Sequence, residues 1–238
     1  MINLNKFKSS IYVDGANIKD FKDLSKNTLI KGFTTNPSLM RSSGVLNYLK
    51  FAKQVLKIVK RKPVSFEIFA DDANNIVSQA LKIKELGENV FVKIPIITTN
   101  NKSNADLIVK LNRMGIKINV TAIFTLNQSL PLIKKLDKKT EIILSIFAGR
   151  IADTGVNPKV EIKKHISACK KKKNIKILWA SVREVYNIIE AEEVKCHIVT
   201  VPPSILKKTK NFNKSLEKYS QETVKNFYDD AKKSGYSL

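Results

Sequence analysis

The chain of 238 residues contains few cysteines, glycines and arginines, and each scarcity excludes a class of structure. Its two cysteines, Cys169 and Cys196, show no metal-ligand spacing, so we expect a reduced cytoplasmic protein without a metal site. The eight glycines include no GxGxxG fingerprint of dinucleotide binding. No apolar run is long enough to span a membrane, and the N-terminus lacks the apolar core of a signal peptide.

Positive charge, in contrast, is abundant. Lysine and arginine number 43 against 21 acidic residues, which gives a formal net charge of +22. This charge is compatible with nucleic acid, an anionic membrane or phosphorylated substrates as partners. The lysines are scattered, however, and asparagine and isoleucine are abundant too, so drift in composition explains much of the charge. An arginine in such a chain indicates a place where lysine would not serve.

Short apolar runs alternate with longer amphipathic runs along the chain. The apolar runs predict strands at residues 9–13, 29–34, 64–69, 90–94, 116–121, 141–147, 175–180 and 196–201. The amphipathic runs predict helices at residues 17–26, 46–60, 72–86, 104–114, 125–136, 159–171 and 183–191. A short helical turn at 202–208 and a long C-terminal helix at about 213–234 follow.

Eight strands alternating with helices predict an α/β protein, a single (β/α)8 TIM barrel domain over residues 1–238. A doubly wound open sheet is the alternative, but it would usually carry a phosphate-binding glycine motif after the first strand. The first predicted strand instead ends in VDGAN.

One lysine interrupts the most apolar of these strands. In VFVKIPI, residues 90–96, Lys93 stands where a buried strand would carry valine or isoleucine. A buried ammonium must lose its charge, find a partner or face a polar cavity. An unprotonated lysine in such a place can form a Schiff base, whereas an ordinary strand lysine lies at an edge or on the surface.

Polar side chains gather where the predicted strands end, which in a barrel is the rim that carries catalytic groups. They are Asp14, Asn17, Thr34, Thr35, Asn36, Glu67, Asn119, Thr121, Ser145, Ser181, Arg150 and Arg183. Taken singly, each has an ordinary interpretation, such as a helix cap, a turn former or a rim ion pair. Their convergence on one rim favours a site, and the two arginines with nearby serines form a candidate phosphate clamp.

Three other polar residues fit no such constellation. We interpret His165 as a surface residue and His197 as a strand residue. Asp153, close to Gly155, is interpreted as part of a loop.

Six motifs together resemble the short, barrel-only members of the transaldolase family. They are VDGAN at 13–17, GFTTNPSL at 32–39, FVKIP at 91–95, INVTAIFT at 118–125, FAGRIADTG at 147–155 and WASVRE at 179–184. The resemblance covers nearly the whole chain, and TTNPSL together with VKIP and NVT is highly specific.

The resemblance implies a role for each residue that matches a motif. Lys93 corresponds to the Schiff-base lysine, Asp14 to the acid–base group at the sugar hydroxyl, and Glu67 with Thr121 to the pair holding a catalytic water. The dihydroxyacetone ligands correspond to Thr34, Asn36, Asn119 and Ser145, with Phe147 beside them, and the phosphate ligands to Arg150, Ser181 and Arg183. Neither a metal nor an organic cofactor is implied.

The implied activity is the transfer of dihydroxyacetone from sedoheptulose 7-phosphate to glyceraldehyde 3-phosphate in the pentose phosphate pathway. The family also contains fructose 6-phosphate aldolases, which release free dihydroxyacetone and tend to have Gln and Tyr in place of Glu67 and Phe147. The sequence departs from many members at Gly15 and Ile146. A third hypothesis is an inactive, basic, nucleic-acid-binding barrel.

The resemblance also implies assembly. Short members form ring-shaped homo-oligomers, often decamers, in which the C-terminal helix packs on a neighbour. In this chain the C-terminal helix could serve in that way or cap its own barrel.

Overall fold

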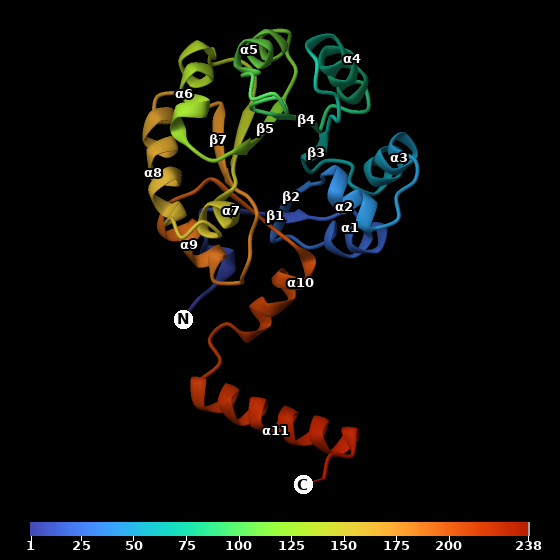
Figure 1. Ribbon diagram of the computed structural model, residues 1–238, viewed down its shortest axis with the longest axis vertical. Coiled ribbons are helices and arrows are strands. Elements are labelled where there is room, and N and C mark those ends of the chain that lie inside the picture. The colour runs from blue at the N-terminus through green and yellow to red at the C-terminus, as the bar shows by residue number, and fades with distance from the viewer. Residues whose placement is uncertain (238) are drawn as a thin grey trace.

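Eight parallel strands form a closed barrel in the computed structural model, which describes residues 1–237. Each strand pairs with the next along the chain, and β8 pairs with β1. The strands are β1 (Ser10–Asp14), β2 (Ile30–Thr34), β3 (Val64–Glu67), β4 (Val90–Pro95), β5 (Ile118–Ile123), β6 (Ile142–Ile146), β7 (Ile175–Trp179) and β8 (Ile198–Val201). Helices lie around the outside of the strands (Figure 1), so the predicted (β/α)8 barrel is confirmed.

The described helices follow the strands with short connections. They are α1 (Ile18–Leu24), α2 (Pro37–Ser42), α3 (Tyr48–Ile58), α4 (Ala73–Lys84), α5 (Ala105–Arg113), α6 (Leu126–Lys135), α7 (Ala148–Ala152), α8 (Pro158–Cys169), α9 (Asn187–Glu193), α10 (Pro203–Leu206) and α11 (Leu216–Ser234). Two 3-10 turns, η1 (Leu4–Lys6) and η2 (Lys207–Asn211), complete the set.

Side-chain caps explain where many of these helices begin. The side chains of Asn17, Asn36, Asn47, Asp72, Asn157 and Ser215 each accept a hydrogen bond from a backbone N–H in the first turn. Such caps satisfy amide groups that have no partner within the helix. Some of the abundant asparagines of this chain therefore serve as helix caps.

Three helical segments differ from the sequence predictions. No element was predicted between residues 34 and 46, but Asn36 and Pro37 form the cap and first residue of α2. The predicted loop after β6 contains the single-turn helix α7. Helix α9 begins at Asn187 and not at Arg183, because the Asn187 side chain accepts hydrogen bonds from the backbone N–H groups of Arg183 and Glu184 and holds them in a turn.

The interior of the barrel changes from apolar to polar along its axis. A small cluster of buried residues inside the barrel comprises Tyr12, Phe91, Ile143, Leu178, Ala180 and Ile198. Side chains of a strand alternate between faces, so the next inward positions on four of these strands are Asp14, Lys93, Ser145 and Thr200. The apolar layer closes the barrel, and the polar layer above it forms the base of a site.

Gly32 makes room for the Tyr12 ring in the apolar layer. A Cβ atom at Gly32 would lie 2.5 Å from that ring, closer than nonbonded atoms approach. The glycine is therefore required by packing inside the barrel.

A bulge in β5 changes which side chains face the interior. The pairing of β5 with β6 shifts between Val120 and Ile123, and Ala122 adopts a positive φ of 57°. Bulges of this kind reorient side chains next to functional sites. In this chain Thr121 and Ala122 both face the polar end of the barrel, while Ile123 remains in the apolar layer between strands and helices.

His165 is buried, so its interpretation as a surface residue was wrong. Its Nε2 atom lies 2.8 Å from the Ser129 hydroxyl and its Nδ1 atom 2.7 Å from the Glu161 carbonyl oxygen. Burial lowers the pKa of the His165 imidazole. The residue joins α8 to α6 as a hydrogen-bonded part of the core, which a sequence pattern in a lysine-rich helix does not reveal.

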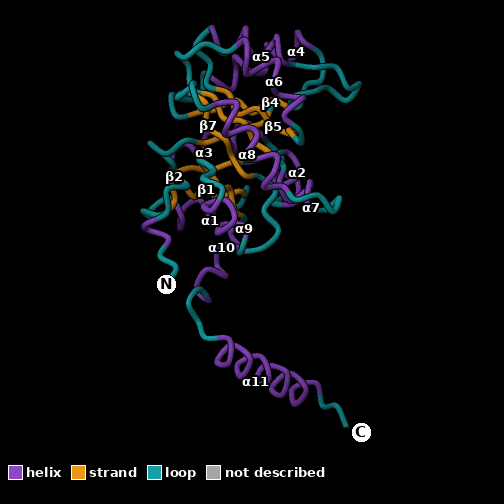
Figure 2. Tube along the Cα trace, turned by 90° about the vertical axis from the view of Figure 1, so that its left-hand side faces the viewer, coloured by secondary structure: helices purple, strands orange, loops and turns teal. Residues whose placement is uncertain are grey.

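The C-terminal helix α11 extends away from the barrel (Figures 1 and 2). None of its residues is buried, so the alternative in which it caps its own barrel is wrong. The segment leading to it is fixed by Asn213, whose side chain makes two hydrogen bonds of 2.7 Å with the backbone of Ile2. Among residues 1–237 no helix has both the length and the apolar character needed to cross a bilayer.

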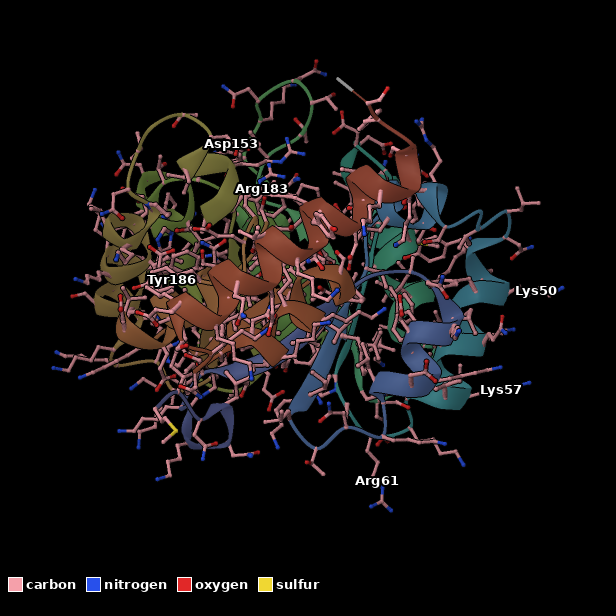
Figure 3. All side chains as sticks on the ribbon, turned by 90° about the horizontal axis from the view of Figure 1, so that it is seen from below. Lys50, Lys57, Arg61, Asp153, Arg183 and Tyr186 are labelled. Carbon is pink, nitrogen blue, oxygen red and sulfur yellow. The ribbon has the colours of Figure 1, made fainter. Side chains whose placement is uncertain are left out.

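Basic side chains lie on the outer surface of the barrel. Lys50, Lys57 and Arg61 are exposed and point outward on the side formed by α3 (Figure 3). They lie outside the polar cavity described below.

Candidate active site

A cavity of about 610 Å³ lies at the carboxyl ends of the strands. Its polar lining includes Asp14, Thr34, Asn36, Glu67, Lys93, Thr121, Ser145, Arg150, Ser181, Arg183 and Thr200. Phe147 and Phe124 form part of its apolar wall, with ring centroids 6.0 Å apart. All the residues predicted for catalysis or binding, except Asn119, therefore meet at one cavity.

Lys93 lies on the floor of this cavity and is only 5% exposed. Its Nζ atom is 3.0 Å from the Oε2 atom of Glu67 and donates a hydrogen bond of 3.1 Å to the carbonyl oxygen of Thr35. The register of β3 and β4 pairs Glu67 with Lys93, which places the two side chains next to each other. The lysine has thus found a carboxylate partner and also faces a polar cavity.

Asp14 ends β1, which β2 and β3 separate from the β4 strand of Lys93 around the barrel. The Thr34 hydroxyl donates a hydrogen bond of 2.7 Å to its Oδ1 atom, and a second hydroxyl, that of Thr200, lies 2.6 Å from Thr34 Oγ1. Burial raises the pKa of Asp14, while the charge of Lys93 and the hydrogen bond from Thr34 act in the opposite direction. The net shift is upward, which brings this carboxyl group closer to the range useful for acid–base chemistry.

The Thr121 hydroxyl is buried and has no hydrogen-bond partner within residues 1–237. Buried hydroxyl groups nearly always have partners, so an exception at a cavity indicates a place for a water or a ligand atom. Glu67 lines the same cavity and can supply the acceptor that such a water needs.

Asn119 supports the cavity from below and does not line it. It is fully buried, donates a hydrogen bond of 3.0 Å to the Ser65 hydroxyl and accepts one of 2.6 Å from the Ser145 hydroxyl. Its contact with the cavity runs through Ser145, which does line it. The oxygen of Asn36 caps α2, so this residue offers its amide NH2 group to the cavity.

Two arginines stand at the outer part of the cavity on separate segments. Arg150 belongs to α7, and Arg183 follows β7. Arg183 makes an ion pair of 2.5 Å with Asp153, and Figure 3 shows the two side chains beside each other. Asp153 was interpreted as a loop residue, but it ends α7 and holds one arginine of the candidate phosphate clamp.

The arginine segments approach each other closely at Gly149. A Cβ atom at this position would lie 1.7 Å from the Ser181 carbonyl oxygen, so only glycine fits there. Ser181 itself has a positive φ of 62°, which turns the chain after β7. This contact joins the two segments that carry Arg150 and Arg183.

Sequence reasoning missed Thr200, Ser65 and Phe124. Thr200 and Ser65 occupy inward positions on β8 and β3, and alternation along those strands could have identified them. No signal in the sequence distinguishes Phe124 from an ordinary core aromatic. Residues 1–237 contain no group of three or more His, Cys, Asp or Glu side chains placed to hold a metal ion.

Comparison with protein families gives one match that covers most of the chain. The model of the family Transaldolase/Fructose-6-phosphate aldolase matches residues 11–238. A protein of Bartonella henselae named "Probable transaldolase" is 30% identical over 231 residues, with 95% of this chain and 98% of that protein covered. A "Probable transaldolase" of Methanococcus vannielii is 33% identical over 208 residues, covering 86% and 90% of the two chains.

Solved structures share the architecture at low sequence identity. KGPDC from Streptococcus mutans superimposes with a TM-score of 0.54 at 11% identity, covering 82% of this chain and 88% of that chain. Thiamine phosphate pyrophosphorylase from Pyrococcus furiosus gives 0.51 at 11% identity, covering 84% and 88%. These likenesses concern the fold alone.

Proposed function

Since the chain belongs to the transaldolase/fructose-6-phosphate aldolase family, we propose that it is a transaldolase, a transferase of aldehyde or ketone residues. The proposed reaction moves a dihydroxyacetone unit from sedoheptulose 7-phosphate to glyceraldehyde 3-phosphate, giving erythrose 4-phosphate and fructose 6-phosphate. The observation that carries the proposal is the buried Lys93 amine on the floor of a polar cavity, beside Glu67 and with Asp14 in the same lining.

Covalent attachment of the ketose is the first step. Glu67 takes the proton of the Lys93 ammonium, and the free amine attacks the C2 carbonyl carbon of the sugar. The resulting carbinolamine loses its hydroxyl group as water, which leaves an iminium ion. Glu67 and the unpartnered Thr121 hydroxyl are placed to hold this water and to carry its protons.

Cleavage of the carbon–carbon bond uses the iminium ion as an electron sink. Asp14 takes the proton of the C4 hydroxyl group, the C3–C4 bond breaks, and its electron pair moves into the iminium to give an enamine. The aldose phosphate leaves with the new carbonyl group at the former C4. Asp14 lies within the reach of the Lys93 charge, which supports a shared role at one substrate.

Transfer is the reverse sequence on a second aldose. The enamine attacks the aldehyde carbon of the acceptor, Asp14 returns its proton to the new hydroxyl group, and water hydrolyses the iminium to release the product. Arg150, Arg183 and Ser181 would hold the phosphate of donor and acceptor alike, which supports acceptance of sugars of different length.

The three-carbon unit needs ligands of its own during the exchange. Thr34, Asn36 and Ser145 line the cavity near Lys93 and offer hydroxyl and amide groups, and Asn119 orients Ser145. Phe147 closes one wall together with Phe124. An apolar wall beside the enamine would limit the access of water to it, which would favour transfer over release.

Trapping and turnover test the proposal together. Borohydride with fructose 6-phosphate should leave a reduced three-carbon adduct on Lys93, detected by peptide mass, and Lys93→Ala should give none. A coupled assay with the acceptor erythrose 4-phosphate should form sedoheptulose 7-phosphate. Without an acceptor, rapid accumulation of free dihydroxyacetone would favour the alternative, a fructose 6-phosphate aldolase activity. No adduct and no turnover, with strongly salt-dependent DNA or RNA binding, would favour the basic binding barrel.

We also propose that the chain assembles through α11 into a ring-shaped homo-oligomer, such as a decamer. None of the residues of α11 is buried against the barrel, and the helix exposes the apolar side chains of Leu216, Val224, Phe227 and Tyr228. Exposed apolar surface of this kind marks an association site. We propose that a second copy of the chain packs against this surface of α11.

We further propose a reducing compartment such as the cytoplasm, because Cys169 and Cys196 are free and buried.

A further inference from the structure

Three side chains on neighbouring strands form a continuous hydrogen-bonded chain at the rim. Thr34 Oγ1 lies 2.7 Å from Asp14 Oδ1 and 2.6 Å from Thr200 Oγ1. The order of the strands, β8 to β1 to β2, brings them together, because Asp14 pairs in register with Thr34 and Thr200 with Tyr12. Thr200 lines the cavity, yet the steps described above make no use of it.

The direction of the two hydrogen bonds follows from counting protons. A threonine hydroxyl has one proton to donate. When Thr34 donates its proton to the Asp14 carboxylate, it can only accept from Thr200, so Thr200 must be the donor of the second bond. Both protons then point toward Asp14.

The two hydroxyl groups are shielded from solvent. Thr34 and Thr200 are 2% and 3% exposed, so bulk water does not readily replace either partner. Hydrogen bonds in series polarise one another, and the effect is larger where the surroundings are apolar. The bond between Thr34 and Thr200 therefore strengthens the bond between Thr34 and Asp14.

We propose that Thr200 is a positioning residue of the reaction: its hydroxyl donates to Thr34 and holds Thr34 in the orientation in which it donates to Asp14. This inference rests on the proposed function, in which Asp14 takes the proton of the sugar hydroxyl. The chain of hydrogen bonds stabilises the ionised carboxylate, the form that acts as the base, and fixes its Oδ1 atom.

Other charges that face Asp14 remain in place when Thr200 is changed. Lys93 lowers the pKa of Asp14, and Glu67, Arg150 and Arg183 line the same cavity. None of them bonds to Thr34 or Thr200 among the described contacts. A change at Thr200 therefore tests the hydroxyl chain and not the ionic surroundings.

The experiment compares Thr200→Val with Thr200→Ser and the wild type. Valine keeps the shape and removes the hydroxyl, so the acid limb of the pH profile of kcat/KM should move up by about 0.5 pH unit, with a roughly 3-fold loss of rate on that limb. Serine keeps the hydroxyl and should restore the wild-type profile. Because Asp14 acts after imine formation, borohydride should trap more full-length sugar and less three-carbon adduct on Lys93 in the valine variant.

Ser9→Ala is the matched control. Ser9 is buried at the opposite end of β1 and donates one hydrogen bond of 2.6 Å to the Cys196 carbonyl oxygen, so its loss removes a buried hydroxyl without touching the rim. Its pH profile should equal that of the wild type. The positioning role would be overturned if the pH profile of kcat/KM of Thr200→Val superimposed on that of the wild type. It would also be overturned if Ser9→Ala shifted the acid limb by the same amount as Thr200→Val.

A second measurement separates this inference from the proposed function. The pKa of Asp14 can be followed by carboxyl-carbon NMR in the ligand-free protein, with Asp14→Asn to assign the signal. A higher pKa in Thr200→Val than in the wild type supports the hydroxyl chain whether or not the protein transfers dihydroxyacetone, and an unchanged pKa overturns it. A wild type that forms no Lys93 adduct overturns the proposed function alone.

Discussion

Glu67 and Lys93 occupy paired positions on β3 and β4, and Glu67 Oε2 lies 3.0 Å from Lys93 Nζ. Both side chains are largely buried, so solvent screens their interaction only weakly. The carboxylate is therefore placed to take the proton that keeps the amine from reacting, and to return it when the imine is hydrolysed.

Glu67→Gln should slow imine formation while the fold is retained. Glutamine has the same size and can still accept a hydrogen bond from Lys93, but it cannot take a proton. General acid–base catalysis contributes about 10²–10⁴-fold, and we expect a loss of that order in kcat. The measurement is the single-turnover rate of borohydride trapping on Lys93. A variant that traps at the wild-type rate would show that Glu67 is only a structural partner.

Thr121→Val should impair the reaction with little change in stability. The Thr121 hydroxyl has no partner in the described chain and is placed to bind a water together with Glu67. Valine has the same shape and breaks no hydrogen bond within the described chain, so the free energy of unfolding should change by less than about 1 kcal/mol. Turnover should fall, since the water held with Glu67 loses one of its ligands. Denaturant unfolding and the coupled assay measure the two effects.

Thr35→Val is the matched control for this stability change. The Thr35 hydroxyl is equally buried, but it donates a hydrogen bond of 3.1 Å to the Ser65 carbonyl oxygen. The same substitution should therefore lower the free energy of unfolding by about 1 kcal/mol. A loss of stability in Thr121→Val as large as that in Thr35→Val would indicate that the Thr121 hydroxyl makes a hydrogen bond within the folded protein and is not free to bind the water.

The barrel and most of its rim could be predicted because both depend on local patterns. Apolar runs of strand length gave the strands, and the polar residues that end them fell on one rim because parallel strands end together. The finer arrangement depends on contacts between distant segments. Gly149 against Ser181, the ion pair of Arg183 with Asp153, and the burial of His165 all join residues that no periodicity relates.

The bulge at Ala122 and the start of α9 illustrate the same limit. Ala122 has an ordinary strand sequence around it, and its positive φ follows from the pairing of β5 with β6. Arg183 begins an amphipathic run, but the Asn187 side chain binds the backbone of Arg183 and delays the helix. In both places tertiary structure overrides a local preference.

The ionised Asp14 carboxylate should destabilise the folded protein at neutral pH. Burial, the largest cause, raises its pKa above the ordinary value of 3.8, so the folded chain binds this proton more tightly than the unfolded chain does. The cost is absent below the unfolded-state pKa and grows as the pH rises through the folded-state pKa. Asp14→Asn should therefore raise Tm at pH 7, and the gain should shrink as the pH falls toward 4. Thermal unfolding at several pH values measures it, and a gain that is constant with pH would contradict the assignment.

Phe227→Asp should reduce the molecular mass in solution. Phe227 is 70% exposed on α11, and a charge there cannot be buried against a second copy without a large penalty. Light scattering at several concentrations should show a smaller species than the wild type. Leu46→Asp is the control, because Leu46 is fully exposed in the segment before α3 and its replacement should leave the mass unchanged. A wild type that is already monomeric would rule out assembly through α11.

Gly149→Ala should weaken phosphate binding more than it slows chemistry. The added Cβ would lie 1.7 Å from the Ser181 carbonyl oxygen, so α7 and the segment after β7 must move apart. Such overpacking typically costs about 1–3 kcal/mol of stability, and it changes the distance between the two arginines. We expect KM for phosphorylated sugars to rise about tenfold, because this is the effect of losing one charge-assisted hydrogen bond to the phosphate.

Comparing phosphorylated and unphosphorylated acceptors shows whether Gly149→Ala acts through the phosphate site. Unphosphorylated glyceraldehyde used as acceptor does not need the clamp, so its kcat/KM should change far less than that of glyceraldehyde 3-phosphate. Gly15→Ala is the stability control, since a Cβ there meets its nearest neighbour, Pro203, at an ordinary 3.7 Å. Equal losses with both acceptors in Gly149→Ala would mean that the contact supports the fold of the rim as a whole and does not set the spacing of Arg150 and Arg183.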